Sequence, residues 1–261
     1  AGLLPFWLSA YLLGVLTASY YFGVFAMSWD LLFGFAGEVN FGPTFLIGLG
    51  AYSAAILNNE YHFSILLCLI AAAATALAGG VLLAVPALRL RGPYFGLVTL
   101  VAVLLLQNAI VIFAKFTGGE IGMTVFDVLS IDAITNYYYA LGFLIVSGLV
   151  LTRLANSAFG LILQASGQDP VEAAVLGFNV TKYKVAAFCV SAILSGLAGA
   201  MLIFYMGAAS VDTVIDISIG VQIIIAAILG GRRTIIGAAF GAVFLLVATE
   251  FLRPLGQLNT F

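Results

Sequence analysis

Apolar residues fill long, nearly unbroken stretches of this chain, and short polar breaks divide it into nine segments. A helix needs about 20 mostly apolar residues to cross the hydrocarbon of a bilayer. Because the stretches are continuously apolar rather than alternating, they predict spanning helices and not the strands of a barrel. The predicted segments are residues 3–19, 20–36, 43–57, 64–86, 94–114, 138–154, 183–205, 217–230 and 235–252.

The pattern therefore predicts an all-α, polytopic membrane bundle of about eight to ten spans. It forms one transmembrane domain over residues 1–261. The third and eighth segments are short and interrupted by glycine, so either is a candidate half-helix.

The composition agrees with lipid as the surrounding solvent. Hydrophobic residues make up 64% of the 261 residues and charged residues only 8%. An ordinary soluble domain carries about 25% charged residues, so this chain could not cover a water-facing surface. Its net charge of −2 predicts no nucleic-acid partner.

Few side chains suggest metal or catalytic chemistry. Cys68 and Cys189 stand alone inside apolar runs, as small buried hydrophobic residues do, and not at a metal-ligand spacing. His62, the one histidine, lies beside Glu60 in a polar break and favours a loop position over a general base. The sequence thus predicts neither a metal site nor a catalytic residue.

The basic residues set the orientation, because cytoplasmic loops of membrane proteins are enriched in Lys and Arg. With strictly alternating spans, seven of the nine basic residues fall on one side: Arg89, Arg91, Arg153, Lys182, Lys184, Arg232 and Arg233. The other side receives Glu60, Glu120, Asp127, Asp132 and Asp212, with Lys115 and Arg253. This map places the N-terminus inside the cell and the C-terminus outside.

Residues 153–184, on the cytoplasmic side, are too polar to span a bilayer and too long for a tight turn. Gly177 and Asn179 are typical of a helix end. A helix start is predicted from an N-cap acid, a proline at the first position and an acid at the third: Asp169, Pro170 and Glu172. We expect a short amphipathic helix in or under the membrane surface.

Two polar breaks share one pattern of acid, β-branched, small polar, apolar and Gly, at residues 38–42 and 216–220. They lie in opposite halves and on opposite sides, as an inverted repeat requires. Paired broken segments indicate a transport path, because freed backbone groups are tolerated in lipid only beside protein or water. The predicted path residues are Gly37, Glu38, Asn40, Gly42, Asp216, Ser218, Gly220 and Gln222.

An alternative interpretation is that Glu38 and Asp216 lie at the membrane interface and cap the helices that follow them. A carboxylate within a span costs about 2.5–3.5 kcal/mol at the helix centre, so it should face a cavity or a partner. The two interpretations are compatible.

Several short motifs follow one another along the chain. They are residues 32–42 (LFGFAGEVNFG), 48–52, 88–100, 117–122 (TGGEIG), 159–184, 195–200 (SGLAGA) and 229–232 (LGGR) with Gly237. In this order they resemble the high-affinity branched-chain amino acid permease family of ABC importers. The resemblance covers most of residues 30–250. The small residues of 195–200 predict close helix packing, within the chain or against a partner.

The chain departs from the family pattern at several positions. The family usually has Gln where Glu38 stands, Ser where Asn40 stands and His where Pro43 stands. It usually has Arg where Gln164 and Ser166 stand. The cargo is therefore open between branched-chain amino acids, other amino acids, urea and short amides.

The resemblance implies a permease subunit that forms half of a translocation path. A Walker-type phosphate loop does not occur in the sequence, so ATP and Mg are expected in partner subunits and no cofactor in this chain. The implied partners are a homologous second permease, two ATPase subunits, an external solute-binding protein and the lipid of a bacterial or archaeal cytoplasmic membrane.

The resemblance also assigns the cytoplasmic segment, about 155–182, to coupling with the ATPases. The expected coupling residues are Gln168, Asp169, Glu172, Ala173, Ala174 and Gly177. An ordinary interfacial helix is the alternative. For the whole chain, the alternative is a secondary transporter or channel that needs no ATPase. A membrane enzyme is disfavoured, because no His/Asp/Glu cluster or Ser–His pair is visible.

Overall fold

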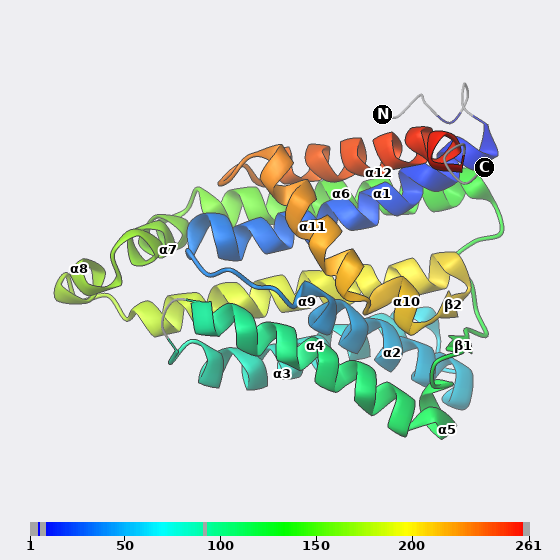
Figure 1. Cartoon of the computed structure of the whole chain (residues 1–261), viewed down its shortest axis with the longest axis horizontal. Helices are drawn as coiled ribbons and strands as arrows, with labels where there is room; N and C mark the ends of the chain where they lie inside the picture. The colour runs from blue at the N-terminus through cyan, green and yellow to red at the C-terminus, as the bar shows by residue number, and fades with distance from the viewer. Residues whose placement is uncertain (1–4, 6–8, 91–92, 258–261) are drawn as a thin grey trace.

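The computed structural model describes residue 5 and residues 9–90 and 93–257, and helices make up almost all of it (Figure 1). The elements are α1 (Ala10–Asp30), the π-helix η2 (Leu31–Phe35), α2 (Pro43–Tyr61), α3 (Ile65–Ala87), α4 (Pro93–Ile112), α5 (Ala114–Thr117), β1 (Met123–Thr124), α6 (Ala133–Ala155), α7 (Ala158–Gln168), α8 (Pro170–Val175), α9 (Val180–Met206), β2 (Ala208–Ala209), α10 (Val211–Val214), α11 (Ile217–Gly230) and α12 (Ile235–Gln257).

Long helices lie side by side along the long axis of the molecule (Figure 1). Within the described residues, seven are long and apolar enough to cross a membrane: Ala10–Phe35, Ile65–Ala87, Tyr94–Ile112, Ala133–Ala155, Val180–Met206, Val211–Gly230 and Ile235–Leu252. The predicted all-α polytopic bundle is confirmed. The count is below the expected eight to ten for two reasons. Segments 3–19 and 20–36 share one helix, and α2 is not among the seven.

The predicted break between residues 19 and 20 is wrong. Thr17 and Ser19 donate their hydroxyls to the carbonyls of Leu13 and Val15, at 2.8 and 2.7 Å, and so stay inside a continuous helix. The Tyr20 hydroxyl lies 2.9 Å from that of Tyr137 on α6. The polar side chains at this boundary are satisfied within the bundle, and α1 with η2 forms one span.

With α1 and η2 as one span, the first span begins on the side opposite to the predicted one. The start of α1 and the end of α12 lie at the same end of the molecule (Figure 1), and Tyr11 there donates a hydrogen bond to Glu250. The expectation that the first span begins on the side opposite the end of the last span is therefore wrong, because one span was counted as two.

The rest of the charge map agrees with the structure. The α3–α4, α6–α9 and α11–α12 connections lie together at one end, here called the basic end, with Arg89, Arg153, Lys182, Lys184, Arg232 and Arg233 (Figure 1). Arg91 lies outside the described residues. The opposite end, here called the acidic end, holds the loops with Glu120, Asp127, Asp132 and Asp212.

The two halves of the bundle have matching contacts. Helix α3 packs against α2 and α9, as α12 packs against α11 and α1. Helix α2 packs on α9, as α11 packs on α1. Since α1 runs toward the basic end and α9 away from it (Figure 1), exchanging α1, α2 and α3 with α9, α11 and α12 reproduces the arrangement with inverted direction. This supports the predicted inverted repeat.

The eighth predicted segment forms a short helix. Helix α11 has only 14 residues, about 21 Å at 1.5 Å per residue, which is short for the hydrocarbon core; the candidate span Val211–Gly230 reaches its length only with α10 before it. Helix α2 begins near the middle of the bundle and ends at the acidic end (Figure 1). The chain reaches both helices through non-helical or short helical stretches, residues 36–42 and 207–216.

Glycines let α2 and α9 approach closely. A Cβ at Gly199 on α9 would lie 2.6 Å from the carbonyl oxygen of Ile47 on α2, and one at Gly196 would meet the side chain of Ala76 on α3. A Cβ at Gly50 would overlap the backbone of Gly196. The small residues of 195–200 therefore pack within the chain, which answers one of the two expectations for that motif.

The loops of the acidic end are pinned to α2. Asn58 is fully buried; it donates to Asp127 at 2.9 Å and to the carbonyl of Phe63 at 3.0 Å, and it accepts from the amide of Asp127. Strands β1 and β2 pair antiparallel beside it. Asp132 caps α6, and its hydrogen bonds with Thr135 lower the pKa of that exposed carboxyl.

Candidate functional site

The break after α1 is held by side chains from two neighbouring helices. The indole of Trp29 donates to the carbonyl of Asn40 at 2.7 Å, and the hydroxyl of Thr99 on α4 accepts from the amide of Phe41 at 3.0 Å. The side chain of Asn40 accepts from the amide of Gly42 at 2.9 Å. The backbone groups freed by the break are thus satisfied inside the bundle.

Two of the predicted path residues in this break need to be glycine. Gly37 has a φ of +72°, which L side chains rarely adopt. A Cβ at Gly42 would overlap the carbonyl of Thr99 on α4. Asn40 and Gly42 are buried, so they shape the start of α2 from within the chain.

Glu38 forms an ion pair with Lys184 on α9. Its carboxylate lies 2.6 Å from the Lys184 ammonium, and the two side chains are only 19% and 12% exposed. Helix α2 has Gly42 as its N-cap and no side-chain cap. The capping interpretation is therefore wrong for Glu38, because the carboxylate turns to a cation across the bundle instead.

Asp216 has the role that the capping interpretation gave it. It is the N-cap of α11, and its carboxylate accepts from the amide of Ser218 at 2.5 Å. A carboxylate at a helix N-terminus is stabilised by the free N–H groups and the helix dipole. The two acids that looked equivalent in the sequence pattern thus have different partners.

The two breaks meet near the middle of the bundle. A Cβ at Gly220 on α11 would lie 3.6 Å from Pro43, the first residue of α2. Gly48 lies against the side chain of Ile215, whose carbonyl accepts from Gln107 at 3.2 Å. The predicted path residues Gly42 and Gly220 therefore lie on either side of one contact, between the starts of α2 and α11.

The remaining two predicted path residues lie apart from this contact. Ser218 and Gln222 are exposed on the face of α11 that turns away from the chain. Ile217, Val221 and Ile225 lie on the same exposed face. Of the predicted path residues on α11, Gly220 therefore faces the start of α2, whereas Ser218 and Gln222 face outward.

The α11–α12 loop binds the end of α1 and η2. The sequence did not indicate this contact. Asp30 is fully buried and accepts from the amide of Arg233 at 3.1 Å. Arg233 donates through Nε to the carbonyl of Gly34 at 2.9 Å, and the Arg232 guanidinium lies 4.8 Å from the ring centre of Phe33. The available signal was Asp30 itself, a lone carboxylate inside an apolar run that requires a partner.

The predicted coupling segment contains two helices, α7 and α8, where one was expected. Asp169 caps α8 and accepts from the amides of Val171 and Glu172 at 2.8 and 3.0 Å, which confirms the predicted start. Gly177, with a φ of +88°, follows its end. Asn179 does not end α8; it is the N-cap of α9.

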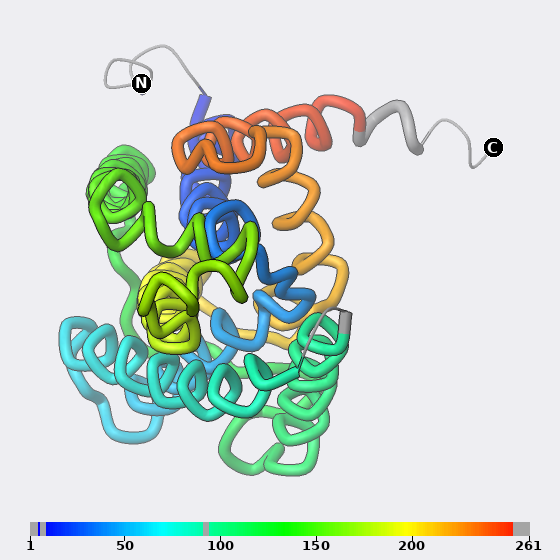
Figure 2. Tube along the Cα trace, turned by 90° about the vertical axis from the view of Figure 1, so that its left-hand side faces the viewer, coloured from blue at the N-terminus to red at the C-terminus, as the bar shows by residue number. Residues whose placement is uncertain are grey.

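Helix α8 forms the tip of the basic end, and α7 and α8 face the viewer in Figure 2. Ala173 is its one buried residue. Of the predicted coupling residues, Gln168, Glu172, Ala174 and Gly177 are exposed and Asp169 is half-buried. Large apolar residues are also exposed there: Val171, Val175 and Leu176, at 67%, 82% and 73%.

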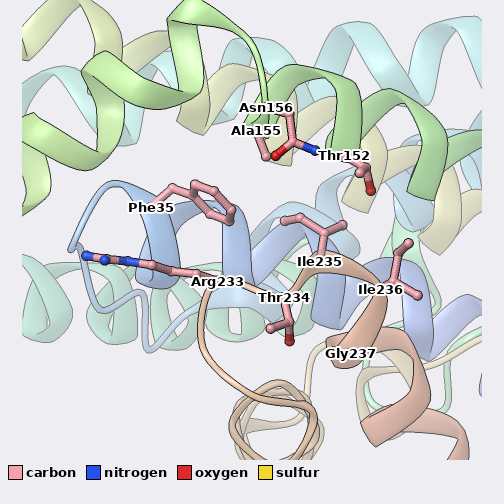
Figure 3. A pocket seen from close by; sticks show the side chains of 9 residues that line it. All are labelled: Phe35, Thr152, Ala155, Asn156, Arg233, Thr234, Ile235, Ile236 and Gly237. Carbon is pink, nitrogen blue, oxygen red and sulfur yellow. The ribbon is translucent and has the colours of Figure 1, made fainter.

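A cavity of about 260 Å³ lies at the basic end, between η2, the end of α6 and the start of α12 (Figure 3). Phe35, Asn156, Arg233 and Ile235 are among its lining residues. None of the predicted path or coupling residues lines it, so it is separate from both groups.

The fold defines a polytopic helical membrane protein with paired broken helices, an architecture of transporters. A family model described as "Branched-chain amino acid transport system / permease component" matches residues 11–260. Since this match covers nearly the whole chain, the chain belongs to that family of permease components.

Two curated relatives carry the same printed name. The chain is 25% identical over 287 residues to the high-affinity branched-chain amino acid transport system permease protein LivM of Salmonella typhimurium (strain LT2) and to that of Escherichia coli (strain K12). The alignments cover 97% of this chain and 66% of each relative, so the chain spans just under two thirds of their length.

A third relative, the fructose import permease protein FrcC of Rhizobium meliloti, is 31% identical over 111 residues. That alignment covers 40% of this chain and 30% of the relative. No solved structure matches the chain.

Proposed function

We propose that this chain is the permease subunit of an ATP-driven importer and forms half of the translocation path for an amino acid or a similar small polar solute. Membership of the permease-component family supports the class. The observation that carries the proposal is α8, a capped helix at the tip of the end where the basic loops gather. A short rigid helix between two spans can pass the movement of an ATPase to the membrane.

The surface of α8 supports a protein partner there. Val171, Val175 and Leu176 expose apolar side chains, which are unfavourable in water and favour burial in a groove. Two ATPase subunits would supply these grooves, one for each permease, and they would hold ATP and Mg. Gln168, Glu172, Ala174 and Gly177 are exposed on the same segment.

The exposed face of α11 supports a second permease subunit. Ser218 and Gln222 present polar side chains from a segment that counts among the candidate membrane spans. Polar groups at membrane depth are costly in lipid and normally face protein or a watery cavity. A homologous permease against this face would enclose them, and the solute would pass between the two subunits and beside the start of α2.

The cargo is a small polar solute: a branched-chain or other amino acid, urea or an amide. Two relatives are named for branched-chain amino acids and a third for fructose, so the family carries more than one solute. An external solute-binding protein would deliver it to the acidic end, where Glu120 and Asp132 lie. The membrane would be the cytoplasmic membrane of a bacterium or archaeon.

A secondary transporter or channel is the second candidate, since paired broken helices serve such proteins too. The exposed apolar tip of α8 favours the importer, because a transporter without an ATPase needs no partner at that place.

The experiment is co-purification of the permease with its cognate ATPase subunits, followed by uptake in vesicles with and without ATP. Val175→Asp places a charge in the apolar contact and should lower the retained ATPase about tenfold or more, a loss of at least 1.4 kcal/mol. The matched control is Ile131→Asp, which changes a residue at least as exposed, 98% against 82% for Val175, at the acidic end. It should retain the ATPase fully. Uptake by the permease alone in ATP-free vesicles would sink the proposal, as would equal ATPase retention in both variants.

A further inference from the structure

The two ends of the coupling segment contact neighbouring residues of the first break. Gly167 lies in the last turn of α7 and Lys184 near the start of α9, so they flank α8 in the sequence. Gly167 lies against Gly37, and Lys184 binds Glu38. The segments on either side of α8 therefore contact two adjacent residues of the break, Gly37 and Glu38.

The contact between the glycines is backbone against backbone. A Cβ on Gly37 would lie 2.8 Å from the carbonyl oxygen of Gly167, and a Cβ on Gly167 would lie 2.6 Å from the carbonyl oxygen of Phe35. Neither position has room for a side chain. Because close-packed groups transmit displacement rather than absorb it, a shift of the end of α7 must shift Gly37.

The contact between Glu38 and Lys184 is electrostatic. Their charged atoms are 2.6 Å apart, and both side chains are largely buried. A charge-assisted hydrogen bond in such surroundings is strong, and loss of one partner leaves the other charge without compensation. Lys184 therefore ties the start of α9 to the break.

From Glu38 the break leads within a few residues to the contact between the two half-helices. The carbonyl of Asn40 and the amide of Phe41 are fixed by Trp29 and Thr99. Pro43 then lies against Gly220 on α11. A displacement of Glu38 can thus reach the contact between the starts of α2 and α11 through a few residues whose backbone is hydrogen-bonded.

We propose that Lys184 is a positioning residue of the transport cycle. Together with Gly167 it clamps Gly37 and Glu38, and this clamp transmits movement of α8 to the start of α2. Glu38 then serves the coupling of ATP hydrolysis to transport, and not contact with the solute. The inference rests on the proposed importer function and deepens it.

The test measures uptake per ATP hydrolysed in the assembled importer, reconstituted in proteoliposomes with its ATPases and binding protein. Glu38→Gln and Lys184→Gln each break the ion pair, and the double Glu38→Gln/Lys184→Gln breaks it without leaving an unpaired charge. All three should lower uptake per ATP about fivefold or more, the lower range of allosteric coupling. The exchanged pair Glu38→Lys/Lys184→Glu should restore uptake per ATP to within about twofold of the wild type, which is below that range.

Lys182→Gln is the matched control, because Lys182 is exposed and two positions away on the same helix. It should leave uptake per ATP unchanged. A merely structural role for the ion pair would lower the yield of assembled complex and leave uptake per ATP in the purified complex intact; that result overturns the inference. So does an exchanged pair that assembles but works no better than the single variants.

Failure of the importer proposal would look different. The wild-type chain would then retain no ATPase and would show no ATP-dependent uptake. Failure of the clamp leaves an active wild-type importer whose uptake per ATP is indifferent to the loss of either charge.

Discussion

At the residue scale, the bundle depends on places where two backbones touch. Gly50 on α2 and Gly196 on α9 face each other with no space between them for a side chain. In lipid there is no hydrophobic force to draw helices together, so van der Waals packing of this kind supplies much of the attraction. Helix α2 packs on α9 through this contact.

Gly50→Ala should therefore destabilise the protein. The added methyl overlaps the backbone of Gly196, and overpacking of this kind costs about 1–3 kcal/mol. Thermal unfolding of the purified protein in detergent should show a lower midpoint. Gly142→Ala on α6 is the control, because nothing lies within 4 Å of its added Cβ. Since alanine is favoured over glycine in a helix interior by about 0.5–1 kcal/mol, the control should equal or exceed the wild type. Equal midpoints for the two variants would contradict the α2–α9 contact.

The same scale explains which side-chain roles could be foreseen. For Asp216 the alternative interpretation as a cap could be foreseen, because its partner Ser218 is two residues away. The partner of Glu38 is 146 residues away in the sequence, and no local pattern contains that pairing. An acidic residue in an apolar segment therefore indicates that it has a partner. Only a partner nearby in the sequence can be identified before the fold is known.

At the element scale, helix ends were predictable where their signals are local. The start of α8 follows from Asp169 and Pro170 in sequence, and the structure has the expected cap. The false boundary between residues 19 and 20 has almost no polar break behind it, because one long apolar stretch was divided into two spans. Ser19 is satisfied by its own helix and Tyr20 by Tyr137 on α6, 117 residues away. Hydropathy alone cannot distinguish a buried, bonded polar residue from a loop.

Helix α8 should depend strongly on its cap. It has six residues, and so short a helix is marginal without tertiary support or capping. Asp169→Ala removes the acceptor for the amides of Val171 and Glu172 and should cost about 1 kcal/mol. Hydrogen exchange should then be about fivefold faster at these two amides, the factor that corresponds to 1 kcal/mol.

Asp169→Asn is the matched variant, because the amide oxygen of Asn can accept the same two hydrogen bonds. Its exchange rates should stay close to those of the wild type. Asn179→Ala removes the cap of α9 instead and should leave Val171 and Glu172 unaffected. Equal protection of both amides in the Ala and Asn variants would refute the capping role of Asp169.

At the scale of the whole molecule, the distribution of charge and the topology agree once α1 is one span. The connections that carry the basic residues lie at one end, and both ends of the described chain lie at the other (Figure 1). Composition and charge bias were sufficient to predict the bundle and its polarity, because they sum over many residues. They were not sufficient to predict the number of spans. A single misplaced break reverses the predicted side of every loop before it.

Cysteine labelling distinguishes the two topologies. In a variant without Cys68 and Cys189, single cysteines are placed at Ser9, Glu60 and Val175, all exposed positions. Because basic loops stay in the cytoplasm, a membrane-impermeant maleimide added outside intact cells should label Ser9→Cys and Glu60→Cys. Val175→Cys should react only after permeabilisation. The nine-segment topology instead places Ser9 within the first span, toward the cytoplasmic side, and predicts that Ser9→Cys is not labelled from outside intact cells. The hydrogen bond between Tyr11 and Glu250 requires the first outcome, since it joins the start of α1 to the last turns of α12 on one side of the membrane.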